Sequence, residues 1–163
     1  MIKNSIEKSI NDQINAELYS AYLYISMSAF FESQNLKGFA HWMQVQAKEE
    51  TKHAMKFYGY LFERGGRVTL QAIEKPPVEW KSALEVFAST YEHEHKVTGR
   101  IHKMVDMANH ENDHATAHFL MWYVDEQVEE EASAFDVVQK LKFIGDSTNG
   151  IYMLDKELGA REG

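Results

Sequence analysis

The sequence predicts an all-α protein: a four-helix bundle with a long connection between its second and third helices and a short fifth helix at the C-terminus. Three observations carry this prediction. Apolar residues recur every three or four positions over long stretches. Only two prolines occur, and the nine glycines fall mostly near expected breaks. With 163 residues, the chain can build one substantial core, so we expect a single domain over residues 1–163.

The breaks between apolar stripes divide the chain into four long helices and one short one. The expected helices cover about residues 5–35, 38–64, 80–109, 113–143 and 147–158. Gly65-Gly66 ends the second helix, and Pro76-Pro77 makes the connection 67–80 extended. Long helices of about 27–31 residues measure about 40–46 Å, and 14 extended residues reach about 46–50 Å. The connection can therefore cross the bundle from end to end and join two antiparallel helix pairs.

Each long helix carries one stripe that should face the core. The stripes of the first two helices are Ile6, Ile10, Ile14, Ala21, Tyr24 and Ser28, then Met43, Ala47, Ala54, Phe57 and Leu61. Those of the third and fourth helices are Leu84, Phe87, Tyr91, Thr98, Ile101 and Val105, then Leu120, Val124, Ala134, Val138 and Leu141. A polar residue interrupts each of the four stripes, namely Glu17, Glu50, Glu94 or Gln127.

Composition excludes several classes of function. The chain has no cysteine, which rules out disulfides and thiolate chemistry and agrees with a cytoplasmic location. Its net charge is -8 with no basic run, so we expect no nucleic-acid partner. No window approaches about 18 uninterrupted apolar residues, and the N-terminus lacks the apolar segment of a secretion signal. We therefore expect no association with a membrane.

The interrupting polar residues repeat at a fixed offset. Glu94 lies 77 positions after Glu17 (94 − 17), and Gln127 lies 77 positions after Glu50 (127 − 50). The same offset relates His53 to Glu130. Each half thus has one carboxylate, followed 33 positions later by a doublet with i, i+3 spacing, whose side chains share one helix face. A carboxylate in a core is costly unless a cation accompanies it.

Six such groups on four helices predict a site for two metal ions. Glu50 is placed to bridge them, Glu17 and His53 would complete one ion, and Glu94 and Glu130 would complete the other. Carboxylate and imidazole ligands without thiolates favour iron or manganese. Gln127 is a neutral, weaker ligand, so the second ion should be held less firmly. The alternative, that all six are ordinary surface residues, explains the repeated spacing poorly.

Other polar residues allow two interpretations each. Glu49, Glu126 and Glu129 form either a solvated acidic face or a third, weaker cation site that shares Glu130. Tyr24, two turns after Glu17, is either a core tyrosine or a group that donates a hydrogen bond or an electron to the site. Histidine recurs at every fourth position at His110, His114 and His118. This spacing favours a row of solvated or interface histidines over a surface metal site.

These residues give the chain a resemblance to the non-haem ferritins of bacteria and archaea, in the ferritin-like superfamily. The segments that look alike are Glu17-Leu18-Tyr19-Ser20, Glu49-Glu50-x-x-His53, Gln127-x-Glu129-Glu130-Glu131 and Tyr152-x-x-Asp155-Lys156-Glu157-Leu158. The resemblance implies a first iron site of Glu17, Glu50 and His53, and a second of Glu50, Glu94 and Glu130 with Gln127 nearby. It also implies a third site of Glu49, Glu126, Glu129 and Glu130, with Tyr24 beside the centre.

The resemblance further implies the activity and the assembly. Such proteins oxidise Fe(II) with dioxygen or peroxide and store ferric oxide inside a hollow shell of 24 subunits with octahedral symmetry, the fifth helix lying near the four-fold axes. Haem-binding relatives carry a methionine where this chain has Thr51, so no haem is expected. Ala117 and Leu120 replace the acidic residues that line three-fold pores in animal ferritins. The resemblance therefore does not extend to that uptake route.

Two other functions fit the residues less well. A di-iron or di-manganese oxidase or peroxidase without storage would be small and would hold its metal pair tightly, which the neutral Gln127 disfavours. A helical scaffold without metal would be stabilised when Glu17 or Glu50 is replaced by alanine.

Overall fold

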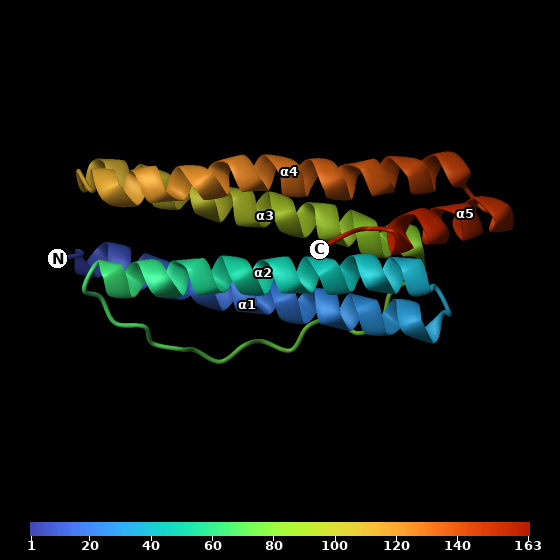
Figure 1. Ribbon diagram of the computed structural model, residues 1–163, viewed down its shortest axis with the longest axis horizontal. Helices are drawn as coiled ribbons and strands as arrows, with labels where there is room; N and C mark the ends of the chain where they lie inside the picture. Colours follow the sequence, from blue (N-terminus) through green and yellow to red (C-terminus); the bar gives the residue numbers. More distant parts are fainter.

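The computed structural model describes all 163 residues as five α-helices and no strands, which confirms the predicted fold class. The helices are α1 (Asn4–Ser33), α2 (Lys37–Glu63), α3 (Ala83–His110), α4 (His114–Ile144) and α5 (Thr148–Gly159). Helix α1 packs antiparallel to α2, and α3 packs antiparallel to α4 (Figure 1). The connection from α2 to α3 runs along the outside of the α1/α2 pair from one end of the bundle to the other (Figure 1).

The third helix begins three residues later than predicted, and this lengthens the connection to residues 64–82. Ser82 is its N-cap, and the Ser82 hydroxyl accepts a hydrogen bond from the Glu85 N–H at 3.1 Å. The Glu85 carboxylate in turn accepts a hydrogen bond from the Lys81 N–H. The sequence Ser82-x-x-Glu85 has the spacing of a capping box, although Glu85 accepts from the residue before the N-cap, and the apolar stripe alone does not reveal this start signal.

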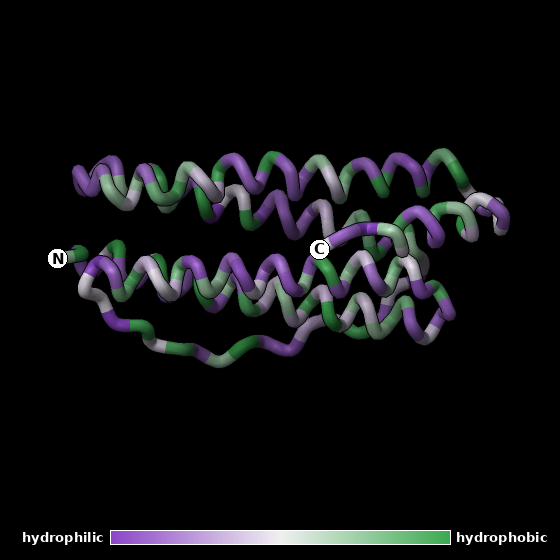
Figure 2. The backbone as a smooth tube through the Cα atoms, in the orientation of Figure 1, coloured by the Kyte–Doolittle hydropathy of each residue, from purple (hydrophilic) through white to green (hydrophobic).

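The predicted stripes are buried throughout on α1 and α2 but are rotated on α3. Figure 2 shows hydrophobic and hydrophilic residues alternating with the turns of each helix. On α3, Tyr91, Thr98 and Val105 are only half-buried, as is Val124 on α4. The residues that α3 buries are Val86, Phe87, Thr90, Glu94, Val97, Ile101, Met104 and Ala108. The stripe prediction was wrong there because Tyr91, Thr98 and Val124 line a surface groove between α3 and α4 instead of the core.

The apolar core is divided into two clusters. One cluster of 16 buried residues lies at the α5 end and includes Tyr24, Phe31 and Phe87. The other, of 13 residues, lies at the opposite end and includes Ile10 and Phe57. The buried polar residues at the midpoints of the long helices lie between these clusters. No Cα atom of α2 comes within 8 Å of one in α4, so side chains fill the space between the two helix pairs.

None of the five helices combines the length and the apolar character that a membrane span requires.

Candidate metal centre

Five acidic or imidazole side chains from all four long helices meet in this polar layer. They form two triads in which the potential ligand atoms lie within 4.8 Å of one another. The first triad is Glu17, Glu50 and His53, and the second is Glu50, Glu94 and Glu130. All five residues are at most 5% exposed. Glu50 is the one residue that belongs to both triads.

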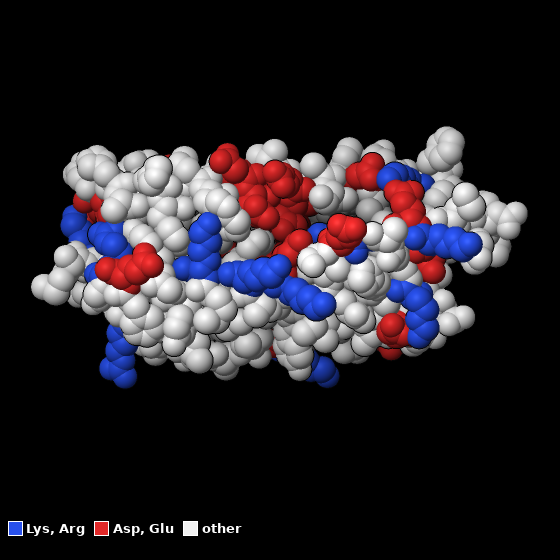
Figure 3. Space-filling model, viewed as in Figure 1, with Lys and Arg blue, Asp and Glu red and all other residues white.

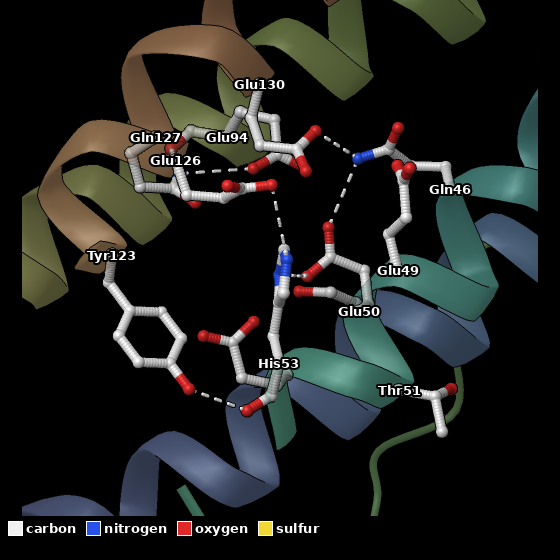
Figure 4. A network of polar contacts seen from close by, with 12 residues as sticks. Gln46, Glu49, Glu50, Thr51, His53, Glu94, Tyr123, Glu126, Gln127 and Glu130 are labelled. Carbon is white, nitrogen blue, oxygen red and sulfur yellow. Dashed lines mark hydrogen bonds and ion pairs between the residues drawn. The ribbon is translucent and has the colours of Figure 1, made fainter. Parts of the chain in front are cut away.

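The imidazole of His53 is oriented by groups on both sides of its ring (Figure 4). Its Nδ1 atom lies 3.2 Å from Glu50 Oε2, and its Nε2 atom lies 3.7 Å from Glu126 Oε1. The Tyr123 hydroxyl donates a hydrogen bond of 2.8 Å to the His53 carbonyl, which fixes this turn of α2. The two ring nitrogens therefore face carboxylates on either side, Nδ1 toward Glu50 and Nε2 toward Glu126.

Burial raises the pKa values of the carboxyl groups in the second triad. Burial, reinforced by Glu94 and Glu17, raises the pKa of Glu50 well above its usual range. Burial raises the pKa of Glu94 to about 7, although hydrogen bonds from Tyr24 and Gln127 lower it. Burial and the charge of Glu94 raise the pKa of Glu130 to about 8. Crowded carboxylates of one sign disfavour ionisation, and a cation among them would reverse that preference.

Two buried oxygen atoms in the layer, Glu17 Oε2 and Gln46 Oε1, have no hydrogen-bond partner, and the first belongs to a carboxylate of the first triad. Glu17 Oε1 accepts a hydrogen bond of 2.8 Å from Gln13 Nε2, whereas Glu17 Oε2 is buried without any hydrogen-bond partner. Leaving a buried polar atom unsatisfied costs about 1–3 kcal/mol, and more when it is charged. A divalent cation would satisfy this oxygen, and carboxylate oxygens with one imidazole suit iron or manganese. The residues present therefore fit a pair of such ions.

Gln127 and Tyr24 both contact Glu94. Gln127 Nε2 donates to Glu94 Oε2, and also to Thr98 Oγ1, at 3.2 Å in each case. The fully buried Tyr24 donates its hydroxyl to Glu94 Oε1. The structure thus places Gln127 as a hydrogen-bond donor to the Glu94 carboxylate, and Tyr24 as a second donor that holds the same group.

The remaining acidic candidates separate in space. Glu126 joins His53 and Glu130 in a third group whose potential ligand atoms lie within 4.8 Å of one another. Glu49 is paired with Arg161 at 2.7 Å, and Glu129 is exposed with no ion pair. Glu129 lies one residue from Glu130, about 100° around the helix, and so cannot share its direction. All three histidines of the predicted ladder are exposed, and they belong to none of these groups.

Sequence reasoning missed the glutamines that hold the ligands. Gln13 lies one turn before Glu17 and accepts a hydrogen bond of 3.0 Å from Arg100 Nε. Gln46 lies one turn before Glu50, donates to Glu50 Oε1 at 3.3 Å, and also donates to Glu130. The signal was present, because Gln13 and Gln46 are separated by the same 33 positions as the two ligands that they contact.

Comparison with known proteins agrees with this geometry. The family model described as a ferritin-like domain matches residues 7–144. A bacterial non-heme ferritin of Bacteroides fragilis is 44% identical over 161 residues, covering 99% of this chain and 100% of that protein. A probable bacterial non-heme ferritin-like protein of Haemophilus influenzae is 41% identical over 159 residues, covering 98% of this chain and 96% of that protein.

The comparison of structures gives the same result. The open-pore ferritin of the hyperthermophilic archaeon Archaeoglobus fulgidus is 55% identical, superimposes with a TM-score of 0.99 and covers 99% of both chains. The matches extend over almost the whole chain, and the family-model match over residues 7–144 spans the positions of both triads. From these matches, together with the fold and its two triads, we conclude that the chain belongs to the ferritin-like family.

Proposed function

We propose that this chain is an iron-storage protein that oxidises Fe(II) at the centre between its helix pairs. The single observation that carries the proposal is the position of Glu50 in both triads, since one shared carboxylate can hold two ions side by side. Glu17, Glu50 and His53 would bind one Fe(II), and Glu50, Glu94 and Glu130 the other. Fe(II) is the substrate here, and it leaves the site after oxidation.

The residues of the chain supply binding, orientation and proton transfer. Binding of Fe(II) displaces protons from carboxyl groups whose pKa values lie near or above neutrality in its absence. Two Fe(II) ions give up one electron each, and one dioxygen takes both electrons with two protons to become hydrogen peroxide. Peroxide is the alternative oxidant, and its reduction by two electrons and two protons yields two waters. Gln127 and Tyr24 orient the Glu94 carboxylate by donating hydrogen bonds to it.

The proposal extends to storage within a shell of identical subunits, with 24 copies as the expected number. The relatives are ferritins by name, which favours storage over the alternative of a small oxidase or peroxidase. An accessible surface of 9211 Å² exceeds the roughly 8300 Å² expected for a monomer of this mass. Several large apolar side chains are exposed on it, including Ile25, Leu70, Phe143, Tyr152 and Met153. Burial of such residues between subunits would stabilise an assembly.

The test measures particle mass and Fe(II) oxidation on one sample. Light scattering should give about 24 chains per particle, and aerobic additions of Fe(II) should be oxidised far beyond two ions per chain. Glu50→Gln should slow the initial rate of Fe(II) oxidation by about 100-fold or more, because both ions lose a ligand. Glu63→Gln, an exposed carboxylate at the end of α2, is the matched control and should leave the rate unchanged. A small particle that stops after two ions per chain would contradict storage, and an unchanged rate in Glu50→Gln would contradict the site.

A further inference from the structure

The two carboxylate oxygens of Glu17 have different surroundings. Oε1 accepts a hydrogen bond of 2.8 Å from Gln13 Nε2, and Oε2 is buried without a hydrogen-bond partner. Gln13 lies one turn before Glu17 on α1 and is buried with it, so solvent does not compete for this bond. An oxygen that already accepts an N–H has less capacity left for a cation than one that accepts nothing. The hydrogen bond from Gln13 therefore favours Oε2 as the metal-binding oxygen.

Arg100 on α3 contacts α1 at two consecutive residues. Its Nε atom donates to Gln13 Oε1 at 3.0 Å, and its Nη2 atom donates to the Asp12 carbonyl at 3.1 Å. A guanidinium group is planar and holds its donors in a rigid fork, so two contacts of this kind fix its position against the helix. Arg100 is thus the partner that holds the oxygen end of the Gln13 amide.

The Gln13 amide is held in one of its two orientations. Its oxygen faces the Arg100 guanidinium, and its nitrogen faces the Glu17 carboxylate. A rotation of the amide by 180° would place oxygen against the carboxylate and N–H against the guanidinium, and both hydrogen bonds would be lost. A cationic donor at one end of such a chain also polarises the amide and strengthens the bond at the other end. Arg100 therefore orients Glu17 without touching it.

Arg100 approaches the centre from the side opposite to its acidic surface. Figure 3 shows Asp and Glu side chains gathered at the middle of the face that α2 and α4 present. The helices that carry Gln13 and Arg100, α1 and α3, pack against each other behind that face (Figure 1). Arg100 is exposed there, whereas Gln13 and Glu17 are each only 1% exposed. Because its side chain lies at the surface, Arg100 can be replaced without opening the core.

We propose that Arg100 is a positioning residue of the metal centre, which acts through Gln13 to hold Glu17 as a one-oxygen ligand for the ion of the first triad. This inference rests on the proposed function, because it presumes that both triads bind metal. Groups that orient metal ligands by hydrogen bonds typically contribute about 10–100-fold in metal affinity. If loss of Arg100 leaves the productive orientation populated about a tenth of the time, that ion should bind about tenfold more weakly. The ion of the second triad should be unaffected.

Calorimetric titration of the assembled protein with Zn(II) measures both affinities without redox chemistry. Glu17→Gln identifies the ion of the first triad as the one that it weakens. Arg100→Met, which keeps the length of the side chain, should weaken that ion about tenfold and change the other less than twofold. Arg100→Lys keeps the charge and one donor, so its loss should be smaller. Lys103→Gln removes a charge from the same groove between α1 and α3, and as the control it should change neither affinity more than twofold.

A double-mutant cycle tests whether Arg100 acts through Gln13. Gln13→Leu alone should weaken the ion of the first triad by about 10–100-fold. Because the group that Arg100 orients is then missing, adding Arg100→Met to Gln13→Leu should cost less than a further twofold.

Infrared difference spectra between Zn(II)-loaded and metal-free protein give a readout that does not depend on affinity. The separation of the two C–O stretches of a carboxylate is wider when it binds a metal through one oxygen than through two. The Glu17 signal, identified by its loss in Glu17→Gln, should show the wide separation in the unmodified chain. In Gln13→Leu both oxygens are free to bind, so the separation should narrow.

The outcomes separate this inference from the proposed function. If both ions bind and Arg100→Met changes the first by less than twofold, the inference is refuted while the proposed function stands. An equal loss for both ions, or the same loss in Lys103→Gln, would also refute it, since the cause would be general loosening or charge. So would a full tenfold loss from Arg100→Met in the Gln13→Leu background, or a Glu17 signal that Gln13→Leu leaves unchanged. If Zn(II) binds at neither triad, the proposed function itself is wrong.

Discussion

Replacing Glu130 with glutamine should stabilise the metal-free protein at neutral pH. Burial raises the pKa of Glu130 from 4.5 to about 8. Because the folded pKa lies above the unfolded one, the folded state keeps a proton that the unfolded state releases. The contribution of Glu130 to stability is therefore greatest below about pH 4.5 and is lost as the pH rises toward about 8. Glutamine keeps the shape and still accepts the Gln46 hydrogen bond, but it does not titrate.

The size of this effect follows from the interval over which the proton is retained. At pH 7 the unfolded carboxyl is 2.5 units above its pKa of 4.5, which at 1.36 kcal/mol per unit amounts to about 3 kcal/mol. At pH 5 the same reasoning gives about 1 kcal/mol. Glu130 is only 5% exposed, so solvent does not screen the cost of ionising its carboxyl group. For a chain of this length, 3 kcal/mol corresponds to an increase of about 6–12 °C in Tm.

Scanning calorimetry in the presence of a chelator, at equal chain concentration, measures the change. Glu130→Gln should raise Tm by that amount at pH 7 and by only about 2–4 °C at pH 5. Glu129→Gln, an exposed neighbour on α4, should stay within about 1 °C at both pH values. A Glu130→Gln variant that melts at or below the unmodified chain at pH 7 would refute the reasoning. So would an equal gain at both pH values, since it would show that ionisation is not the cause.

Three further outcomes are expected. Zn(II) at about 100 times its dissociation constant should stabilise the chain by about 2.7 kcal/mol in thermal melts, and Glu17→Gln should lose most of that gain; equal gains in both proteins would place the metal elsewhere. Gly38→Ala should detach α5, because its Cβ would collide with the Asp155 carbonyl, and hydrogen exchange should rise in residues 148–159 but not in α3. Phe57→Ala should cost about 3–5 kcal/mol in denaturant unfolding, because Phe57 is fully buried and stacks on Tyr123 at 4.0 Å; a cost below about 1 kcal/mol would contradict that packing.

Helical periodicity is a local property, and this is why the sequence predicted the bundle so well. The stripes on α1 and α2, the stops at Gly65 and Gly145, and the length of each long helix all depend on residues within a few turns of each other. The candidate ligands could be predicted for the same reason. Glu17, Glu50 and Glu94 break apolar stripes, and a charge placed where a core residue belongs is informative without any knowledge of neighbouring helices.

Contacts between helices decided what local patterns leave open. Both Glu49 and Glu129 follow the acidic pattern, yet Glu129 points to solvent and Glu49 pairs with Arg161, a residue 112 positions away. Gln127 donates hydrogen bonds to Glu94, and this role depends on how α3 and α4 are rotated against each other. Such rotations are set by side-chain packing over the whole bundle, which no short window of sequence contains. The sequence by itself determined which residues could bind metal, and the tertiary structure decided which of them face one another.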